Sequence, residues 1–76
     1  MIKVYTSPTC QPCRLTKQYL DRGNIAYETI DIAENPAAVS EIAAMGYRQV
    51  PVVVVTPDEH WNGFRPDLMG NLRGFR

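Results

Sequence analysis

Cys10 and Cys13 are the only cysteines of the 76-residue chain, and two residues separate them in the segment TSPTCQPC. Such a pair serves as a disulfide that fastens a fold, as half of a metal site, or as a dithiol that is oxidised and reduced in turn. A disulfide between such near neighbours closes a very small loop and stabilises little. A structural zinc site needs four ligands, mostly Cys and His, and the chain adds only His60. The pair therefore favours redox chemistry, with a metal-binding module as the alternative from a different functional class.

The strands and helices that position this pair can be predicted from changes in the spacing of hydrophobic residues along the chain. Hydrophobic and polar side chains alternate over residues 2–6, which predicts a strand. Residues 11–22 lack glycine and are predicted to form a helix that ends at Gly23, with Thr9 as its N-cap. Asn35 and Pro36 mark the start of a second helix that ends at Gly46. The other predicted elements are strands at 25–32 and 50–56, a short return strand in HWNGF (60–64), and a helix from Pro66 with Leu68, Leu72 and Phe75 on one face.

This order, β-α-β-α-β-β-α, predicts a single α/β domain over residues 1–76. The first three elements should form a right-handed parallel unit and the last two strands an antiparallel hairpin, which gives a four-stranded mixed sheet with helices on both faces. Cys10 then lies where the first strand ends and the first helix begins. In open α/β sheets this edge commonly carries the chemistry.

A helix N-terminus favours a thiolate, because it presents unpaired N–H groups and the positive end of the helix dipole. Cys10, at the tip of the helix, should have the more strongly stabilised thiolate and the more exposed sulfur, so we assign it as the nucleophile. Cys13, one turn further on, is the predicted resolving cysteine, which attacks the mixed disulfide that Cys10 forms. Arg14 and Lys17 add positive charge nearby.

The composition excludes several function classes. Eight basic and eight acidic residues cancel, so nothing suggests a nucleic-acid partner. No apolar run approaches the roughly 20 residues of a membrane span, and the first residues do not open a signal peptide. We therefore expect a cytoplasmic monomer with no membrane partner and no bound metal.

Val50-Pro51 opens the predicted third strand. Proline cannot donate to a strand ladder, so it belongs at the first position of a buried strand. The residues alone leave open whether this X-Pro bond is cis or trans.

Three segments together resemble a known family. VYTSPTCQPC, QVPVVVV and the hairpin are similar to the thioredoxin-fold superfamily, specifically to its short glutaredoxin-like branch, in which the proline matching Pro51 is cis and lies against the dithiol. HWNGFRPDLM resembles the W-S-G-F-R-P-D signature of NrdH-redoxins. Six of the seven motif residues match: Trp61, Gly63, Phe64, Arg65, Pro66 and Asp67.

The resemblance implies a thiol–disulfide oxidoreductase with no bound cofactor beyond its own Cys10–Cys13 disulfide. Its implied partners are thioredoxin reductase, which draws electrons from NADPH, and the large subunit of a class Ib ribonucleotide reductase. The chain departs from the family at Asn62, which replaces the motif serine, and in its Gln11-Pro12 spacer. A glutathione-dependent glutaredoxin is the other redox alternative. The Gly-Gly pair that glutaredoxins use to hold glutathione is absent, because bulky Phe64 follows Gly63.

A redoxin must dock on its reductase and its client, so apolar groups should lie beside the exposed sulfur. We expect Trp61 to be the aromatic anchor of this surface, with Val50 and Phe64 near it. Trp61 and Phe64 both have a second interpretation, as residues that close the core. Arg65 and Asp67 flank the helix-starting proline and are predicted to support the site.

Overall fold

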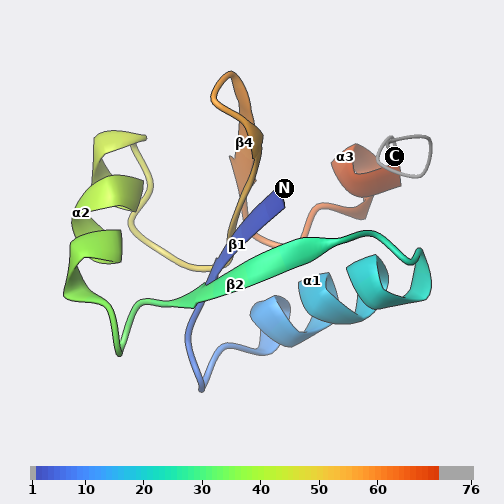
Figure 1. Ribbon diagram of the computed structural model, residues 1–76, viewed down its shortest axis with the longest axis horizontal. Helices are drawn as coiled ribbons and strands as arrows, with labels where there is room; N and C mark the ends of the chain where they lie inside the picture. Colours follow the sequence, from blue (N-terminus) through green and yellow to red (C-terminus); the bar gives the residue numbers. More distant parts are fainter. Residues whose placement is uncertain (1, 71–76) are drawn as a thin grey trace.

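The computed structural model describes residues 2–70 and confirms the predicted order of seven elements (Figure 1). These are β1 (Ile2–Thr6), α1 (Gln11–Arg22), β2 (Tyr27–Asp31), α2 (Pro36–Ala44), β3 (Val52–Thr56), β4 (Glu59–Asn62) and α3 (Pro66–Met69). The predicted positions Leu72 and Phe75 of the last helix lie outside the described residues. No helix within residues 2–70 has the length and apolar character needed to cross a membrane.

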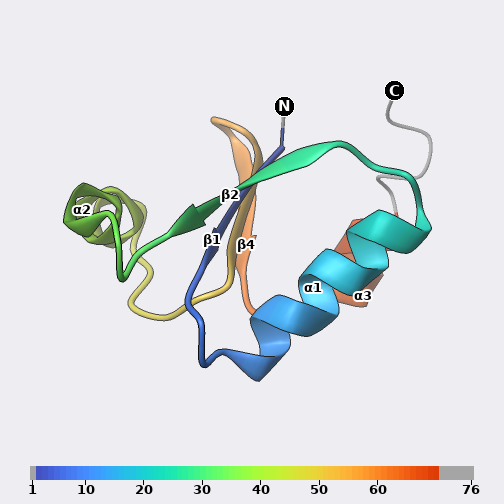
Figure 2. The same ribbon diagram turned by 60° about the horizontal axis from the view of Figure 1, so that its bottom comes forward.

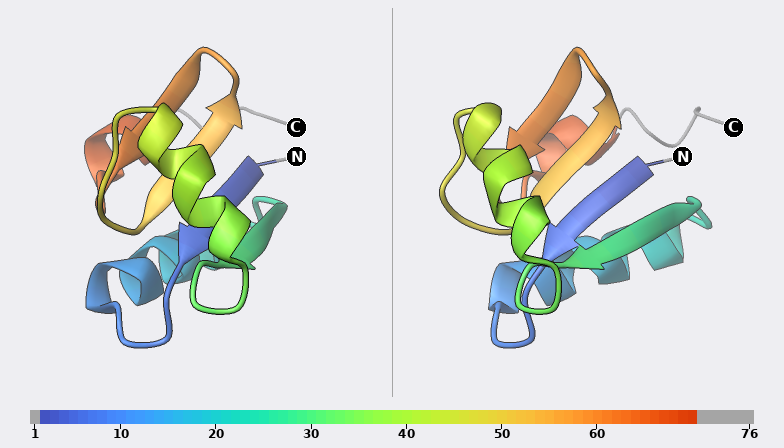
Figure 3. Two further views of the ribbon diagram at one scale, coloured as in Figure 1. Left: turned by 90° about the vertical axis from the view of Figure 1, so that its left-hand side faces the viewer. Right: turned by 60° about the vertical axis from the view of Figure 1, so that its left-hand side comes forward.

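The four strands form one mixed sheet in the order β2-β1-β3-β4 (Figure 3). β1 runs parallel to β2, with Thr6 opposite Asp31 at the end of the pair. β3 is antiparallel both to β1 and to β4. The predicted parallel β-α-β unit and antiparallel hairpin are both confirmed, and β1 is a central strand whose C-terminal end leads directly to the cysteines.

The sheet separates two hydrophobic clusters, because α1 and α3 cover one face and α2 covers the other (Figure 2). Successive side chains of β1 point to opposite faces, so Val4 joins the first cluster and Tyr5 the second. The buried members of the first cluster are Ile2, Val4, Leu20, Ile25, Val53, Trp61 and Met69. Those of the second are Tyr5, Ala38, Ile42 and Val52.

Three strands are shorter than predicted, and β4 covers Glu59–Asn62 in place of residues 60–64. β2 begins at Tyr27, because Asn24 turns the chain with a left-handed φ of 53° and the Ile25 N–H is bound to the carbonyl of Leu20. β3 begins at Val52, immediately after Pro51. Its first two residues are fully buried, whereas the later ones lie nearer the hairpin turn and are half-buried or exposed.

The buried face of α1 also differs from the most obvious apolar positions. Cys13, Thr16 and Leu20 are fully buried, at a spacing of three and four residues that places them on one helix face. The buried hydroxyl of Thr16 donates a hydrogen bond to the carbonyl oxygen of Pro12 at 2.9 Å. Leu15 lies off this face and is 38% exposed. The helix therefore buries its second cysteine directly against the core.

Candidate active site

A disulfide joins Cys10 and Cys13 at the start of α1, with 5.3 Å between their Cα atoms. Cys10 is partly exposed, whereas Cys13 is completely buried. The backbone N–H of Cys13 donates to the sulfur of Cys10 at 3.2 Å. The two thiols of the reduced pair would therefore differ in access to a partner and in hydrogen bonding, which is the asymmetry that the sequence predicts.

Cys10 is itself the N-cap of α1, and the prediction of Thr9 as the cap was wrong. The backbone of Cys10 is extended (φ −96°, ψ 111°), and its side chain accepts the Cys13 N–H that a helix start leaves unpaired. Its own N–H donates to the carbonyl of Ser7 at 3.3 Å, which tightens the turn after β1. The nucleophile candidate therefore holds the hydrogen-bonding position at which a helix best accommodates negative charge.

The loop between α2 and β3 lies against Cys10. Its Val50-Pro51 peptide bond is cis, and Pro51 is fully buried. The carbonyl oxygen of Val50 lies 3.5 Å from the sulfur of Cys10. Residues 40 positions apart in the chain thus meet at the disulfide.

The loop is fastened to the end of β4. The Asn62 carboxamide donates to the carbonyl of Gln49 at 2.6 Å and approaches that of Pro51 at 3.4 Å. The N–H of Gly63 donates to the same Pro51 carbonyl at 2.8 Å. Gly63 has a φ of +89°, a conformation that side-chain-bearing residues rarely adopt. Two residues of the motif stretch therefore hold the loop that contacts Cys10.

A second attachment of this loop was not foreseen from the sequence. The hydroxyl of Tyr47 lies 2.7 Å from Nδ1 of His60 and 3.2 Å from the carbonyl oxygen of the same residue. The two rings meet edge to face, with 5.5 Å between their centroids. His60 thus has a structural hydrogen bond, and the described part of the chain contains no group of three or more His, Cys, Asp and Glu side chains arranged to hold a metal.

Trp61 is not on the surface, and its predicted role as an exposed docking anchor was wrong. Only 5% of the residue is exposed, and it packs in the first hydrophobic cluster opposite Val53 of β3. Its indole N–H is buried with no hydrogen-bond partner among residues 2–70. Successive side chains of β4 point to opposite faces of the sheet. The Trp61 side chain points to the same face as that of its partner Val53, which is a core residue.

The other two predicted docking residues are half-buried. Phe64 packs against the first cluster and meets Tyr19 edge to face, with 6.4 Å between the ring centroids, so it contributes to the core as its second interpretation holds. Val50 packs against the second cluster while its carbonyl contacts Cys10. The contact of Val50 with the Cys10 sulfur is made by its carbonyl oxygen, at 3.5 Å.

Arg65 and Asp67 form an exposed pair at the start of α3. The Arg65 guanidinium donates two hydrogen bonds to the carboxylate, at 3.2 and 3.0 Å. The hydrogen bond from Arg65 lowers the pKa of Asp67, and the same bond raises that of Arg65. Both side chains are at least half exposed, so the pair contributes little to stability.

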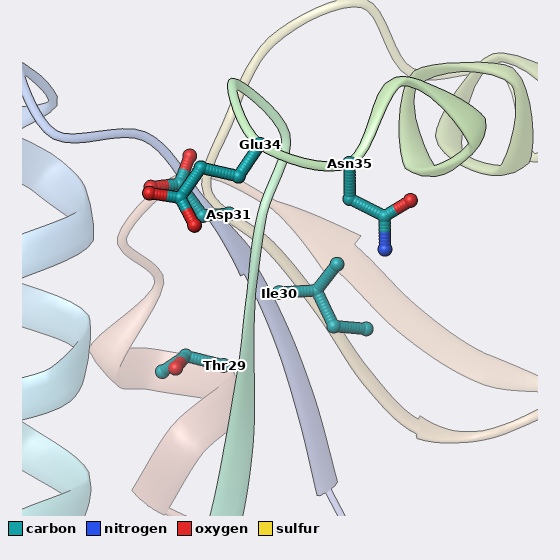
Figure 4. A pocket seen from close by; sticks show the side chains of 5 residues that line it. All are labelled: Thr29, Ile30, Asp31, Glu34 and Asn35. Atoms are coloured by element: carbon teal, nitrogen blue, oxygen red, sulfur yellow. The ribbon is translucent and has the colours of Figure 1, made fainter.

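A polar pocket of about 450 Å³ lies where β2 ends and leads to α2 (Figure 4). The side chains that line it are Thr29, Ile30, Asp31, Glu34 and Asn35. The carboxylates of Asp31 and Glu34 point the same way in this view, and Asp31 accepts the N–H of Ala33 at 2.8 Å. A pocket with two carboxylates and no cation in its lining would repel an anionic ligand.

Comparison with known proteins supports the redox interpretation of the cysteines. The glutaredoxin family profile matches residues 2–61. The glutaredoxin-like protein NrdH of Escherichia coli K12 is 37% identical over 71 residues, which cover 93% of this chain and 86% of that protein. NrdH of Lactococcus lactis strain IL1403 is 35% identical over 72 residues, which cover 95% and 99%. The solved structure of the E. coli NrdH-redoxin superposes with a TM-score of 0.87 and covers 93% of this chain and 92% of that one.

Proposed function

The chain belongs to the NrdH-redoxin branch of the glutaredoxin family and is a thiol–disulfide oxidoreductase of thioredoxin-like fold, and from this membership we propose its electron source and its client. Thioredoxin reductase, drawing on NADPH, reduces the Cys10–Cys13 disulfide. The resulting dithiol then reduces a disulfide on the large subunit of a class Ib ribonucleotide reductase. The protein holds no cofactor of its own in this cycle.

The observation that supports the dithiol cycle of this proposal is the asymmetry of the Cys10–Cys13 pair. Cys10 is accessible and accepts a helix N–H, so its thiolate is both stabilised and able to reach a partner. Cys13 is completely buried, so an external disulfide cannot reach it before Cys10 has reacted. This order of access supports Cys10 as the nucleophile and Cys13 as the resolving cysteine.

The reaction transfers two electrons to the client. The Cys10 thiolate attacks one sulfur of the client disulfide, forms a mixed disulfide and releases the other client sulfur as a thiolate. The Cys13 thiolate then attacks the Cys10 sulfur and releases the second client thiolate. The two protons lost by Cys10 and Cys13 balance those taken up by the client thiols. The client leaves reduced, and the Cys10–Cys13 disulfide has formed again.

Two features favour thioredoxin reductase over glutathione as the electron source. The WNGFRPD stretch resembles the NrdH signature, and the E. coli relative is described as a glutaredoxin-like protein with a thioredoxin-like activity profile. In addition, Gly63 is followed by Phe64, which packs against the core where a glutaredoxin would continue with a second small residue.

The test offers the oxidised protein two reducing systems in parallel. One contains NADPH and thioredoxin reductase, and the other contains NADPH, glutathione and glutathione reductase. NADPH oxidation that depends on the protein is expected in the first system, with Cys10→Ser as the inactive control. Faster turnover in the glutathione system would reverse the assignment. If the first system succeeds, the class Ib reductase is then supplied as client, and deoxyribonucleotide formation is measured.

A further inference from the structure

Asn62 occupies the one position of the seven-residue signature at which this chain differs from its family. Its carboxamide nitrogen lies 2.6 Å from the carbonyl oxygen of Gln49 and 3.4 Å from that of Pro51. A carboxamide nitrogen carries two N–H donors, so one side chain can serve both oxygens. A serine hydroxyl has a single proton and can donate to only one of them.

The two carbonyls that Asn62 holds belong to the residues on either side of Val50. The intervening carbonyl, that of Val50, is turned instead towards the active site and lies 3.5 Å from the sulfur of Cys10. Holding the carbonyls of Gln49 and Pro51 therefore limits how far the Val50 peptide can rotate. The contact with the nucleophile depends on an attachment made on the other side of the loop.

We propose that Asn62 is a positioning residue, which holds the Val50 carbonyl against Cys10 and thereby sets how readily this thiol ionises. The inference concerns the chemistry of Cys10 itself, so it applies whichever reductase reduces the protein.

Two neighbours of the Cys10 sulfur act in opposite directions once the disulfide is reduced. The N–H of Cys13, at 3.2 Å, donates to the sulfur and favours the thiolate. The Val50 oxygen is an acceptor, so it can take a hydrogen bond only from the protonated thiol and turns its negative end towards a thiolate. Ionisation passes the Cys10 proton to water and breaks the hydrogen bond from the thiol to the Val50 oxygen. A firmly held Val50 carbonyl therefore keeps the nucleophile protonated to higher pH than the helix start alone would.

The experiment measures the pH profile of Cys10 alkylation by iodoacetamide in the full chain carrying Cys13→Ser, so that only one thiol reacts. Asn62→Ala removes both donors, and Asn62→Ser restores one. Asn35→Ala is the matched control, because Asn35 is an exposed amide whose side chain makes no capping hydrogen bond. Alkylation needs neither a reductase nor a client, so its result does not depend on the proposed partners.

We expect Asn62→Ala to move the midpoint of the profile to lower pH by about half a unit, roughly a threefold gain in thiolate well below the midpoint. Asn62→Ser should fall between Asn62→Ala and the parent, and Asn35→Ala should match the parent. An unchanged or higher midpoint in Asn62→Ala overturns the proposal, as does an equal shift in Asn35→Ala. If Asn62→Ala does not fold, the serine variant decides: a midpoint at the parent value overturns the proposal, and a lower one supports it.

Discussion

Trp61→Phe and Trp61→Ala together distinguish a core residue from a docking residue. Trp61 is 5% exposed and packs among the buried side chains of the first cluster. Truncation of such a side chain to alanine typically costs about 3–5 kcal/mol. A domain of this length has a free energy of unfolding of roughly 4–11 kcal/mol, so the alanine variant should lose a large share of its stability and unfold at a much lower urea concentration.

The phenylalanine variant should behave very differently. The smaller ring loses burial and packing worth about 1–2 kcal/mol. It also removes an indole N–H that has no partner within residues 2–70, and a buried unpaired donor costs about 1–3 kcal/mol. The two effects oppose each other, so Trp61→Phe should lie within about 1 kcal/mol of the parent.

Urea unfolding followed by circular dichroism measures both variants, since Trp61 is the single tryptophan and its fluorescence is lost in each. Leu20→Ala, in the same cluster and fully buried, provides the reference for an ordinary core truncation. The KM for thioredoxin reductase is measured on the folded phenylalanine variant and should be unchanged. A stable Trp61→Ala protein whose KM for the reductase rises severalfold would refute the core assignment.

Three further predictions test the site and the fold. With a disulfide client, Cys13→Ser should accumulate a mixed disulfide visible by mass spectrometry, whereas Cys10→Ser should form none; wild-type turnover by Cys13→Ser without glutathione would contradict the dithiol cycle. Burial and the 2.8 Å hydrogen bond to Asp21 raise the pKa of Tyr27 to about 12, so between pH 10 and 12 the folded protein keeps a proton that the unfolded chain loses. The stability that this proton contributes is complete below pH 10 and is lost as the pH rises to 12. Tyr27→Phe should therefore show a shallower loss of unfolding free energy from pH 9 to 11 than the parent, and parallel curves would count against this linkage. Gly63→Ala should destabilise by about 1–3 kcal/mol through its φ of +89° alone, because no atom of residues 2–70 beyond its two chain neighbours lies within 4 Å of the added methyl. An unchanged urea midpoint would show that the loop relaxes.

The features that the sequence predicts well are those encoded by neighbouring residues. The helix from Gln11 to Arg22 has its bounds marked by Pro12 near its start and Gly23 after its end, and the structure places it at those residues. The exposure of Cys10 and the burial of Cys13 follow from their places on one helical turn. The chain order of strands and helices likewise follows from local period and turn residues.

The features that were missed depend on contacts between distant segments. Trp61 lies in a four-residue edge strand, and only its pairing opposite Val53 shows that it faces the core. The bond from Asn62 to Gln49, like that between Tyr47 and His60, joins residues 13 positions apart through a loop whose path local patterns do not specify. The cis bond before Pro51 was implied by family resemblance, whereas the residues themselves left it open.

Because the Cys10 sulfur caps α1, each oxidation or reduction changes the acceptor at the start of that helix. A thiolate accepts a hydrogen bond more strongly than a neutral sulfur does, so the first turn is held differently in the two redox states. Folding and reduction then form a closed thermodynamic cycle. The difference in unfolding free energy between the reduced and oxidised forms equals the amount by which the fold shifts the reduction equilibrium from that of an unfolded Cys-x-x-Cys chain. Two unfolding curves, one in each redox state, would thus measure how strongly the fold biases the protein towards accepting electrons or towards giving them up.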